Sequence, residues 1–341
     1  MVHVTRVQIP RRIRFRRVST TLVGLLVLFS FGVLTACSGS ATSDGASPGK
    51  NSASGTPLVL ATTPILGDLV RQVGGDAVDV EVLIPLGADP HDFEPSAAQA
   101  ARLRKASLIV ANGLGLEKNL KTALDGARKD GVTVFEVGEQ LDPLMIDEIH
   151  DAESAADSHD HGTEDPHVWL DPERMSTAAS LVAEQLATTT GLEASGFQTR
   201  ADAYRATALA AMAEANAILA VLPNDERKLI TNHDALAYFA QRFNLDVIGT
   251  VIPGGSTLAE PSAADLTDLV RLIKANNVRA IFSESTVSSK LIETVSREIG
   301  ARVQVVELST DTLGTRGTET ATYAGLIVTT ARLIANGLTD Q

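Results

Sequence analysis

Cysteine is nearly absent from this sequence, since Cys37 is the only one among 341 residues. A chain with one cysteine cannot form an intramolecular disulfide bond, and it cannot bind a metal ion through a cluster of thiolates. Any metal held by the folded part of the chain therefore needs nitrogen and oxygen ligands. Aromatic residues are also scarce, at 4% of the chain, so no aromatic cluster in the sequence indicates an adhesive surface.

Basic charge and the common catalytic motifs are lacking as well. The chain has 29 Lys and Arg residues against 42 Asp and Glu residues, which gives a formal net charge of −13. This balance argues against nucleic acid as a partner and is compatible with binding a cation. The sequence contains no HExxH motif and no Gly-x-Ser-x-Gly motif, and the near-match to a phosphate-binding loop at Gly45–Lys50 has the wrong spacing.

The N-terminal segment has the pattern of an export signal. The arginine-rich stretch Arg11–Arg17 precedes an apolar run, Leu22–Leu34, which is shorter than the roughly 20 apolar residues of a membrane-spanning helix. The run ends in Leu-Thr-Ala before Cys37, which resembles the lipobox of bacterial lipoproteins. We therefore expect residues 1–36 to be a lipoprotein signal peptide and Cys37 to carry a lipid. Residues 37–57, rich in Ser, Gly and Ala, predict a flexible tether that holds the protein at the extracytoplasmic face of the bacterial cell membrane.

Short apolar runs alternate with helix-length amphipathic segments along the rest of the chain, a pattern that predicts βα units with parallel sheets. The strands expected in the first half are Leu58–Ala61, Val78–Ile84, Leu108–Ala111 and Val132–Val137. The strands expected in the second half are Lys228–Thr231, Leu245–Val251, Ala280–Ser283 and Val303–Leu308.

The two halves are also related in sequence. Glu94 and Glu260 each begin an EPSAA pentapeptide, which is preceded by an Ile-Pro pair and followed by an apolar run. One pentapeptide match would mean little, but here the Ile-Pro pair also keeps its distance from the pentapeptide to within two residues. The sequence therefore predicts an α/β fold of two similar βα lobes with parallel sheets, residues 58–195 and 223–341.

Residues 196–222 are predicted to form one long, rigid helix that joins the lobes. The segment is rich in alanine, and its apolar residues recur at helical spacing from Tyr204 to Leu222. Pro223 ends the pattern. A helix of this length spans about 39 Å at 1.5 Å per residue, and such a connection would restrict wide hinge motion between the lobes.

Three histidines follow the carboxyl ends of predicted strands: His91 and His167 in the first lobe, and His233 in the second. Open α/β sheets bind ligands at this edge, and facing lobes bring the three imidazoles together. His91 and His167 both occur in Asp-Pro-His, where proline holds the imidazole on a stiff extended turn. Asp89 and Asp165, which precede the prolines, are candidates to accept the second ring N–H of a histidine. The arrangement predicts a metal site at the lobe interface.

A closed tetrahedral site with three imidazoles needs a fourth ligand. Asp311, just after the last strand of the second lobe, and Glu284, at the end of its third strand, are the competing carboxylates. We favour Asp311 as the ligand and Glu284 as a supporting or structural acid. His150, His159 and His161 lie in an acidic segment with no turn to fix them. They are either a weak accessory metal contact or part of a solvated loop.

Taken together, these motifs resemble the ZnuA/TroA-like family, the metal-binding lipoproteins of bacterial ABC importers. The resemblance rests on GADPHDFEPS, DPHVWLDP, NHDALAYFA, IPGGSTLAEPSA, FSEST and STDTLG in this order, and it covers the chain from Pro57 onward. It implies a membrane permease and a separate ATPase as partners, and a histidine-containing loop before the second ligand, as zinc-type members often carry. It also implies two lobes joined by a rigid helix, with Zn²⁺ or Mn²⁺ held between them by His91, His167, His233 and Asp311.

Zn²⁺ is the expected cargo, because three imidazoles and one carboxylate suit tetrahedral Zn²⁺, whereas Mn²⁺ favours more oxygen ligands. Mn²⁺ stays the alternative, since some members of the family with three histidines also handle manganese. Two other functions are open. A zinc-dependent hydrolase would use an open fourth position with Glu284 as base, and a surface adhesin would use the metal only to stabilise its lobes. We expect a monomeric carrier, not an enzyme, that captures Zn²⁺ outside the membrane and delivers it to the permease.

Overall fold

The computed structural model describes residues 55–146, 164–252, 254, 256–287, 290–299 and 303–339. Cys37, the predicted signal peptide and the tether up to residue 54 lie outside these residues, and so do His150, His159 and His161. No helix in the part of the chain that the structure describes is long and apolar enough to cross a membrane. The described residues all belong to one compact unit, Ser54–Gln341.

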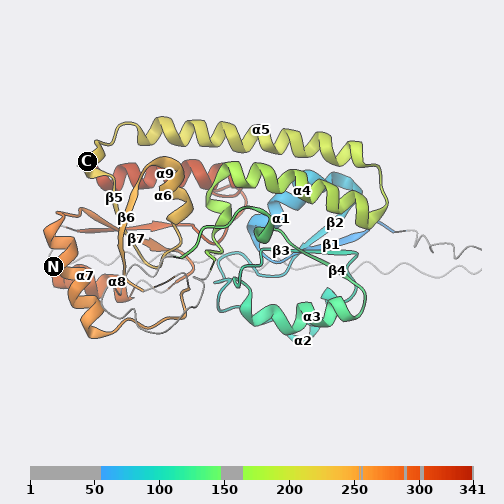
Figure 1. Ribbon diagram of the computed structural model, residues 1–341, viewed down its shortest axis with the longest axis horizontal. Coiled ribbons are helices and arrows are strands. Elements are labelled where there is room, and N and C mark those ends of the chain that lie inside the picture. Colours follow the sequence, from blue (N-terminus) through green and yellow to red (C-terminus); the bar gives the residue numbers. More distant parts are fainter. Residues whose placement is uncertain are drawn as a thin grey trace, which may run out of the picture. The chain divides into compact units, whose positions relative to one another are not determined.

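Two parallel sheets of four strands each form the two lobes (Figure 1). The first sheet has the order β2-β1-β3-β4 and consists of β1 (Leu58–Ala61), β2 (Asp79–Val82), β3 (Leu108–Ala111) and β4 (Thr133–Glu136). The second has the order β6-β5-β7-β8 and consists of β5 (Lys228–Thr231), β6 (Asp246–Thr250), β7 (Ala280–Glu284) and β8 (Gln304–Leu308). Counted within each lobe, both orders read 2-1-3-4, and every pairing is parallel. The predicted α/β fold of two similar lobes is confirmed.

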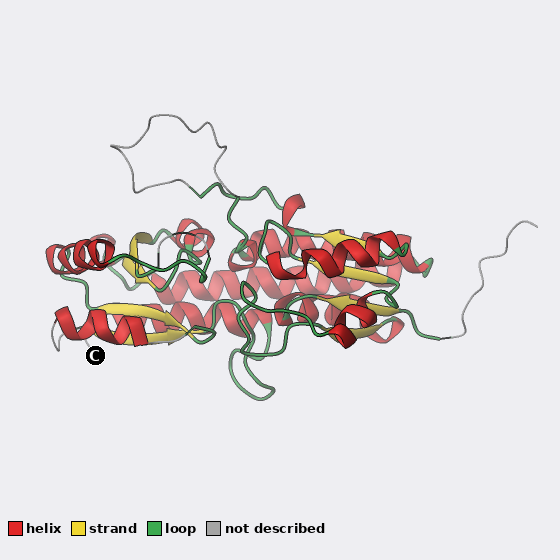
Figure 2. Ribbon diagram, turned by 90° about the horizontal axis from the view of Figure 1, so that it is seen from below, coloured by secondary structure: helices red, strands yellow, loops and turns green. Residues whose placement is uncertain are grey.

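Helices alternate with the strands in both lobes, and Figure 2 shows strands and helices interleaved. The first lobe contains α1 (Pro64–Gly74), α2 (Ala97–Leu103), α3 (Lys121–Lys129) and α4 (Pro172–Thr190). The second contains α6 (Ala237–Phe243), α7 (Ala263–Ala275), α8 (Lys290–Ile299) and α9 (Tyr323–Leu338).

The repeated EPSAA segments begin two equivalent helices, α2 and α7. The Ser96 hydroxyl accepts a hydrogen bond from Gln99 N at 3.3 Å, and Gln99 Oε1 accepts one from Ser96 N at 2.9 Å. Ser262 and Asp265 form the same reciprocal pair at the start of α7, at 3.2 and 2.7 Å. Each pair satisfies two N–H groups at a helix start that have no partner within the helix. The repeated pentapeptide therefore caps the start of an equivalent helix in each lobe.

Helix α5 (Ala194–Leu219) runs beside α4 and α9 (Figure 1). Its 26 residues span about 39 Å, and one face, from Phe197 through Tyr204 to its last turn, is buried. The helix begins two residues before the predicted range 196–222 and ends three residues before its last residue. Pro223 disfavours helical backbone at residue 222 and so stops the helix from continuing further. The use of this segment as a boundary between domains stays a prediction.

The main apolar core is shared by both lobes. Alternate residues of a strand point to opposite faces, so Leu108 and Val110 of β3 join the shared core, whereas Ile109 joins a separate cluster with α2 and α3. In β7, Phe282 joins the shared core and Ile281 joins an outer cluster with α7 and α8. Because α4, α5 and α9 all contribute to the shared core, packed side chains connect the lobes, in addition to the covalent chain.

Candidate metal centre

The two Asp-Pro-His segments fold into the same turn. In the first, after β2, Asp89 Oδ1 accepts a hydrogen bond from His91 N at 2.9 Å. In the second, before α4, Asp165 Oδ1 accepts one from His167 N at 3.0 Å. The intervening proline has a fixed φ and no N–H, so the aspartate side chain bonds to the second residue beyond it, as in an Asx turn. One tripeptide thus gives one local geometry at both places.

The third histidine comes from the other lobe. His233 follows β5 directly, and the Thr231 hydroxyl at the end of that strand donates to His233 O at 2.8 Å. Helix α6 begins four residues after the histidine. The carboxyl ends of parallel strands in the two sheets therefore contribute to one place, as the general rule for open α/β sheets predicts.

The three imidazoles meet through their Nε2 atoms. His167 Nε2 lies 3.3 Å from His91 Nε2 and 3.1 Å from His233 Nε2. The residues are buried, with exposed fractions of 3% for His91 and 0% for the other two. A tetrahedral Zn²⁺ ion with Zn–N bonds of about 2.0–2.1 Å sets its nitrogen ligands about 3.3–3.4 Å apart. The spacing of the imidazole nitrogens therefore fits an ion of this size.

Carboxylates lie beside the second ring nitrogens of two of these histidines. His167 Nδ1 is 2.7 Å from Asp165 Oδ1, and His233 Nδ1 is 2.6 Å from Glu284 Oε2. A carboxylate at Nδ1 favours a proton on that nitrogen, which leaves the Nε2 lone pair for a metal ion. The structure brings Asp165 and Glu284 to the imidazoles, and their role at a bound metal stays a prediction.

Asp89 makes different contacts from Asp165. Its Oδ1 bonds to the backbone of its own turn, and its Oδ2 accepts a hydrogen bond from Thr257 Oγ1 of the other lobe at 2.7 Å. Among the described residues, its carboxylate makes no ion-pair contact or hydrogen bond with the His91 ring. The structure therefore does not bring Asp89 to the His91 ring. It gives Asp89 a contact across the lobe interface and a place near enough to His233 for its charge to help raise the pKa of that imidazole.

Asp311, which follows β8, is a buried carboxylate with one free oxygen. It is 1% exposed, and its ligand atom lies within 4.8 Å of those of His233 and Glu284. Its Oδ2 accepts a long hydrogen bond from Thr286 Oγ1 at 3.4 Å, whereas its Oδ1 has no hydrogen-bond partner. A buried oxygen without a partner is costly, and a cation would satisfy it. Glu284 Oε2 also lacks a hydrogen bond of normal geometry, but it lies 2.6 Å from His233 Nδ1. Asp311 Oδ1 has no such neighbour among the described residues, which favours Asp311 as the carboxylate that binds a metal.

Burial and neighbouring charges separate the protonation states of the three histidines. Burial, together with the two neighbouring imidazoles, lowers the pKa of His91 to about 2. Burial likewise holds the pKa of His167 well below its ordinary value. Burial alone would also lower the pKa of His233, but the adjacent Glu284 and Asp311 carboxylates outweigh it and raise that pKa to about 9. At neutral pH, His91 and His167 are thus neutral and His233 carries a proton in the absence of metal.

Two buried carboxyl groups at the centre hold their protons more tightly than usual. Burial raises the pKa of Asp165 to about 7. Burial and then the nearby Glu284 carboxylate raise the pKa of Asp311 to about 7. A divalent cation would reverse both effects, since positive charge favours the ionised form of an acid. The acidic groups around His233 therefore favour the binding of a cation.

Hydrogen bonds across the interface hold the loops around the centre. Trp169 Nε1 donates to Thr310 O at 2.8 Å, and Gly87 N donates to Thr312 Oγ1 at 3.0 Å. Nothing in the sequence indicated Thr257 and Thr312, which bond across this interface, or Thr286, which bonds to Asp311 within the second lobe. Threonine carries no metal-ligand signal, and the partner of each lies in another segment of the chain, so no local pattern marks them.

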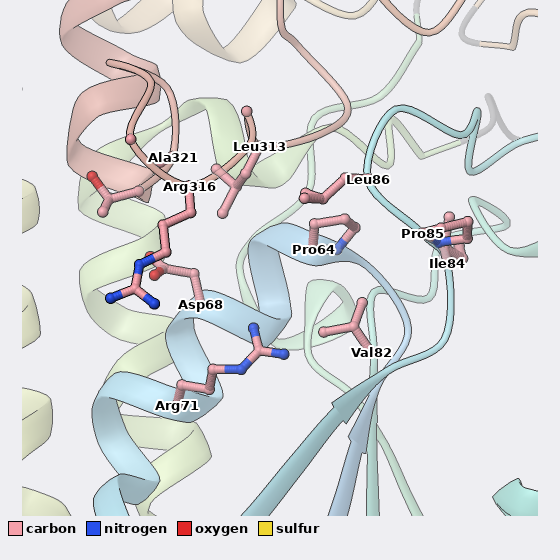
Figure 3. Close-up of a pocket in the computed structure, with 13 residues that line it drawn as sticks. Pro64, Asp68, Arg71, Val82, Ile84, Pro85, Leu86, Leu313, Arg316 and Ala321 are labelled. Carbon is pink, nitrogen blue, oxygen red and sulfur yellow. The ribbon is translucent and has the colours of Figure 1, made fainter. Parts of the chain in front are cut away.

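A separate cavity of about 500 Å³ opens beside α1 (Figure 3). Asp68, Arg71 and Arg316 line it together with apolar side chains such as Val82 and Leu313. None of the residues predicted as metal ligands lines this cavity. This cavity is therefore distinct from the cluster of histidines that forms the candidate metal centre.

The fold and the centre together define a class, the two-lobed α/β proteins with a buried cluster of candidate metal ligands between the lobes. A family model described as "ZnuA: Zinc-uptake complex component A periplasmic" matches residues 59–337. The chain belongs to this family. The resemblance inferred from the sequence motifs is thereby confirmed.

Curated relatives and solved structures agree with this assignment. The chain is 31% identical over 279 residues to the zinc-binding protein TroA of Treponema pallidum (strain Nichols), covering 81% of this chain and 86% of that protein. It is 29% identical over 304 residues to the manganese-binding lipoprotein MntA of Bacillus subtilis (strain 168), covering 88% and 93%. The solved structure of the periplasmic zinc-binding protein TroA from Treponema pallidum matches with a TM-score of 0.75 at 30% identity, covering 84% of this chain and 100% of that one. A crystal structure of ZnuA matches with a TM-score of 0.69 at 29% identity.

Proposed function

We propose that this protein captures Zn²⁺ outside the cell membrane and delivers it to the permease of an ABC importer. In this proposal His91, His167, His233 and Asp311 hold the ion between the lobes. The observation that carries the proposal is the convergence of three buried Nε2 atoms at 3.1 and 3.3 Å. Membership of the zinc-uptake component family supports transport as the purpose of that site.

The donor set favours Zn²⁺ over Mn²⁺. Three imidazoles and one free carboxylate suit a tetrahedral Zn²⁺ ion, whereas Mn²⁺ prefers six ligands, mostly oxygens. The second nearby carboxylate, Glu284, is 2.6 Å from His233 Nδ1 and is occupied there. Mn²⁺ remains the second candidate, because the manganese-binding lipoprotein MntA is similar along 88% of this chain.

The two remaining functions fit the centre less well. The family consists of transport components and not enzymes, and the histidines are at most 3% exposed, so the site offers no open face to a hydrolase substrate. An adhesin whose metal only stabilises the lobes would need the metal for folding. The shared apolar core already connects the lobes without one.

Location and partners follow from the same proposal. The signal peptide 1–36 and a lipid at Cys37 would anchor the protein to the outer surface of the cell membrane, with 37–57 as a tether. The carrier would act as a monomer and would meet a permease that is driven by a separate ATPase. The lobes would be 58–195 and 223–341, joined by 196–222. Relatives that are named as substrate-binding lipoproteins of metal ABC transporters support this arrangement.

Metal content and competition test the proposal. Protein purified without added metal is expected to contain Zn²⁺, to bind one equivalent, and to prefer it to Mn²⁺ in a competition titration. The variant His167→Ala is expected to lose at least ~100-fold in Zn²⁺ affinity, because loss of a ligand exceeds the 10–100-fold cost of losing an outer contact. Asp125→Ala on α3, a partly exposed carboxylate that pairs with Lys121 and Arg128, is the control outside the proposed site. Unchanged binding by His167→Ala would refute the proposed site.

The variant Asp311→Ala separates the carrier from the hydrolase. A carrier loses affinity with its fourth ligand, whereas a hydrolase keeps three histidine ligands and fills the open position with water. We expect weaker Zn²⁺ binding and no ester or peptide hydrolysis in either the wild type or the variant. Hydrolytic turnover that depends on Zn²⁺ would overturn the carrier assignment.

A further inference from the structure

Helix α6 of the second lobe is hydrogen-bonded to residues 165–171 of the first lobe, the segment that contains His167. Tyr238, on α6, donates its hydroxyl hydrogen to Asp165 O at 2.7 Å and accepts a hydrogen bond from Leu144 N at 2.8 Å. Arg242, one turn further along, binds both carboxylate oxygens of Asp171 at 2.8 Å. These contacts lie on either side of His167 in the sequence, so α6 is attached to both ends of its segment.

The backbone N–H, the carbonyl and one carboxylate oxygen of Asp165 all make hydrogen bonds or close polar contacts. Its N–H donates to Leu144 O at 2.7 Å, its carbonyl accepts from Tyr238, and its Oδ1 contacts both His167 N and His167 Nδ1. The residue is 2% exposed. The Tyr238 hydroxyl is therefore connected to the His167 ring through a single residue, Asp165.

Asp171 is anchored just as firmly at the other end. It is 1% exposed, and its side chain accepts from Glu173 N at 2.9 Å at the start of α4 and from Arg174 at 2.7 Å, in addition to the bonds from Arg242. The Arg174 guanidinium also lies over the Tyr238 ring, 4.9 Å from its centroid. The bidentate, largely buried Arg242–Asp171 pair belongs to the stronger class of hydrogen bonds in proteins.

These contacts close a ring that contains two of the candidate ligands. His233 is linked to Tyr238 by the chain that enters α6, and the Tyr238 hydroxyl bonds to Asp165 O. The Asp165 carboxylate contacts His167 Nδ1, and His167 Nε2 lies 3.1 Å from His233 Nε2, which closes the ring. We propose that Tyr238 and Arg242 are positioning residues that fix His233 to His167, so that two ligands from opposite lobes behave as one unit. The inference rests on the proposed function, because it assigns these residues a role in holding the cargo.

Tyr323 provides a matched comparison. It is as buried as Tyr238, and its hydroxyl also donates across the interface to a backbone carbonyl of the same segment, Trp169 O, at 2.9 Å. Its helix, α9, carries no candidate ligand. Loss of either hydroxyl removes one cross-lobe hydrogen bond to residues 165–171, and loss at Tyr238 also removes the bond from Leu144 N. Only the loss at Tyr238 opens the ring that includes His233, and the Tm of each variant corrects for the additional hydrogen bond.

The test compares Tyr238→Phe, Arg242→Met and Tyr323→Phe in the full chain. Zn²⁺ loss is followed by transfer to a chromophoric chelator in stopped flow, and the visible ligand-field band of bound Co²⁺ reports the geometry of the site. We expect Tyr238→Phe and Arg242→Met to lose Zn²⁺ about three- to tenfold faster than the wild type, the range of one net hydrogen bond, and to alter the Co²⁺ band. Tyr323→Phe is expected to keep the wild-type rate and band. Arg242→Lys, which keeps the charge but not the bidentate geometry, is expected to fall between.

Thermal unfolding of the three variants separates positioning from general loosening. Equal acceleration by Tyr238→Phe and Tyr323→Phe, at similar losses of Tm, would make the role of Tyr238 merely structural and overturn the inference. So would an unchanged rate and band in Tyr238→Phe. A wild-type protein that takes up neither Zn²⁺ nor Co²⁺ would instead refute the proposed function, and the inference with it.

Discussion

His233 and Glu284 form a buried pair in which Nδ1 and Oε2 lie 2.6 Å apart, and both residues are at most 3% exposed. The Glu284 carboxylate has two effects on His233, and they favour different occupants of the imidazole, a metal ion in one case and a proton in the other. In the proposed site the carboxylate would orient the imidazole toward a metal ion. It also raises the pKa of the imidazole to about 9, so that without metal the ring is protonated at neutral pH. Metal and proton are therefore alternative cations at His233.

Zn²⁺ affinity is expected to increase with pH up to about 9. The cause is His233, whose pKa of about 9 means that binding releases a proton, with a further contribution from Asp311, whose pKa is about 7. His91, with a pKa of about 2, contributes nothing in this range. Competition titrations between pH 5 and 9, with calorimetry in buffers of different ionisation enthalpy, measure the affinity and the protons released. An affinity that is flat from pH 5 to 8 would contradict this expectation.

The metal-free protein is expected to lose stability as pH rises from 6.5 to 9. The folded pKa of His233 lies above its ordinary value of 6.5, so the folded state binds more protons than the unfolded state in this window. The stabilisation is complete below pH 6.5 and is lost as pH rises through about 9, with a slope of at most about 1.4 kcal/mol per pH unit for one proton. Denaturant unfolding of the metal-free protein at several pH values measures it. In Glu284→Gln, the dependence should flatten, and an unchanged slope there would assign it to another group.

The sequence was sufficient for the fold and for the residues that meet at the centre, but not for the contacts between them. Repeated local patterns revealed the two lobes, and Asp-Pro-His specified the same turn around His91 and His167. The contrast between Asp89 and Asp165 was not predictable, because it depends on whether a hydroxyl from the other lobe, that of Thr257, reaches the carboxylate. Tyr238 was missed for the same reason, since its partners lie 94 and 73 residues away in the chain.

The two aspartates of the Asp-Pro-His turns are expected to differ in their effect on Zn²⁺ binding. Asp165→Ala removes both the turn hydrogen bond and the contact with His167 Nδ1, whereas Asp89→Ala removes the turn hydrogen bond and the contact with Thr257. Loss of a carboxylate that orients a ligand imidazole costs about 10–100-fold in metal affinity, so Asp165→Ala should fall in this range and Asp89→Ala below it. Chelator competition on both variants measures the difference. Equal losses would mean that the turn, and not the imidazole contact, supports the site.

Removal of the metal is expected to leave the protein folded. The shared core contains residues of both sheets and of α4, α5 and α9, so burial of apolar surface holds the lobes together without the ion. Zn²⁺ should nevertheless raise the stability by mass action, by about 4 kcal/mol at a free concentration 1,000 times the Kd. Circular dichroism before and after chelation, with thermal unfolding of both forms, measures the two effects. Loss of helical signal on chelation, rather than a lower Tm alone, would mean that the ion is needed for folding. An adhesin with a purely structural metal would show this behaviour. A carrier has to release its ion and stay folded.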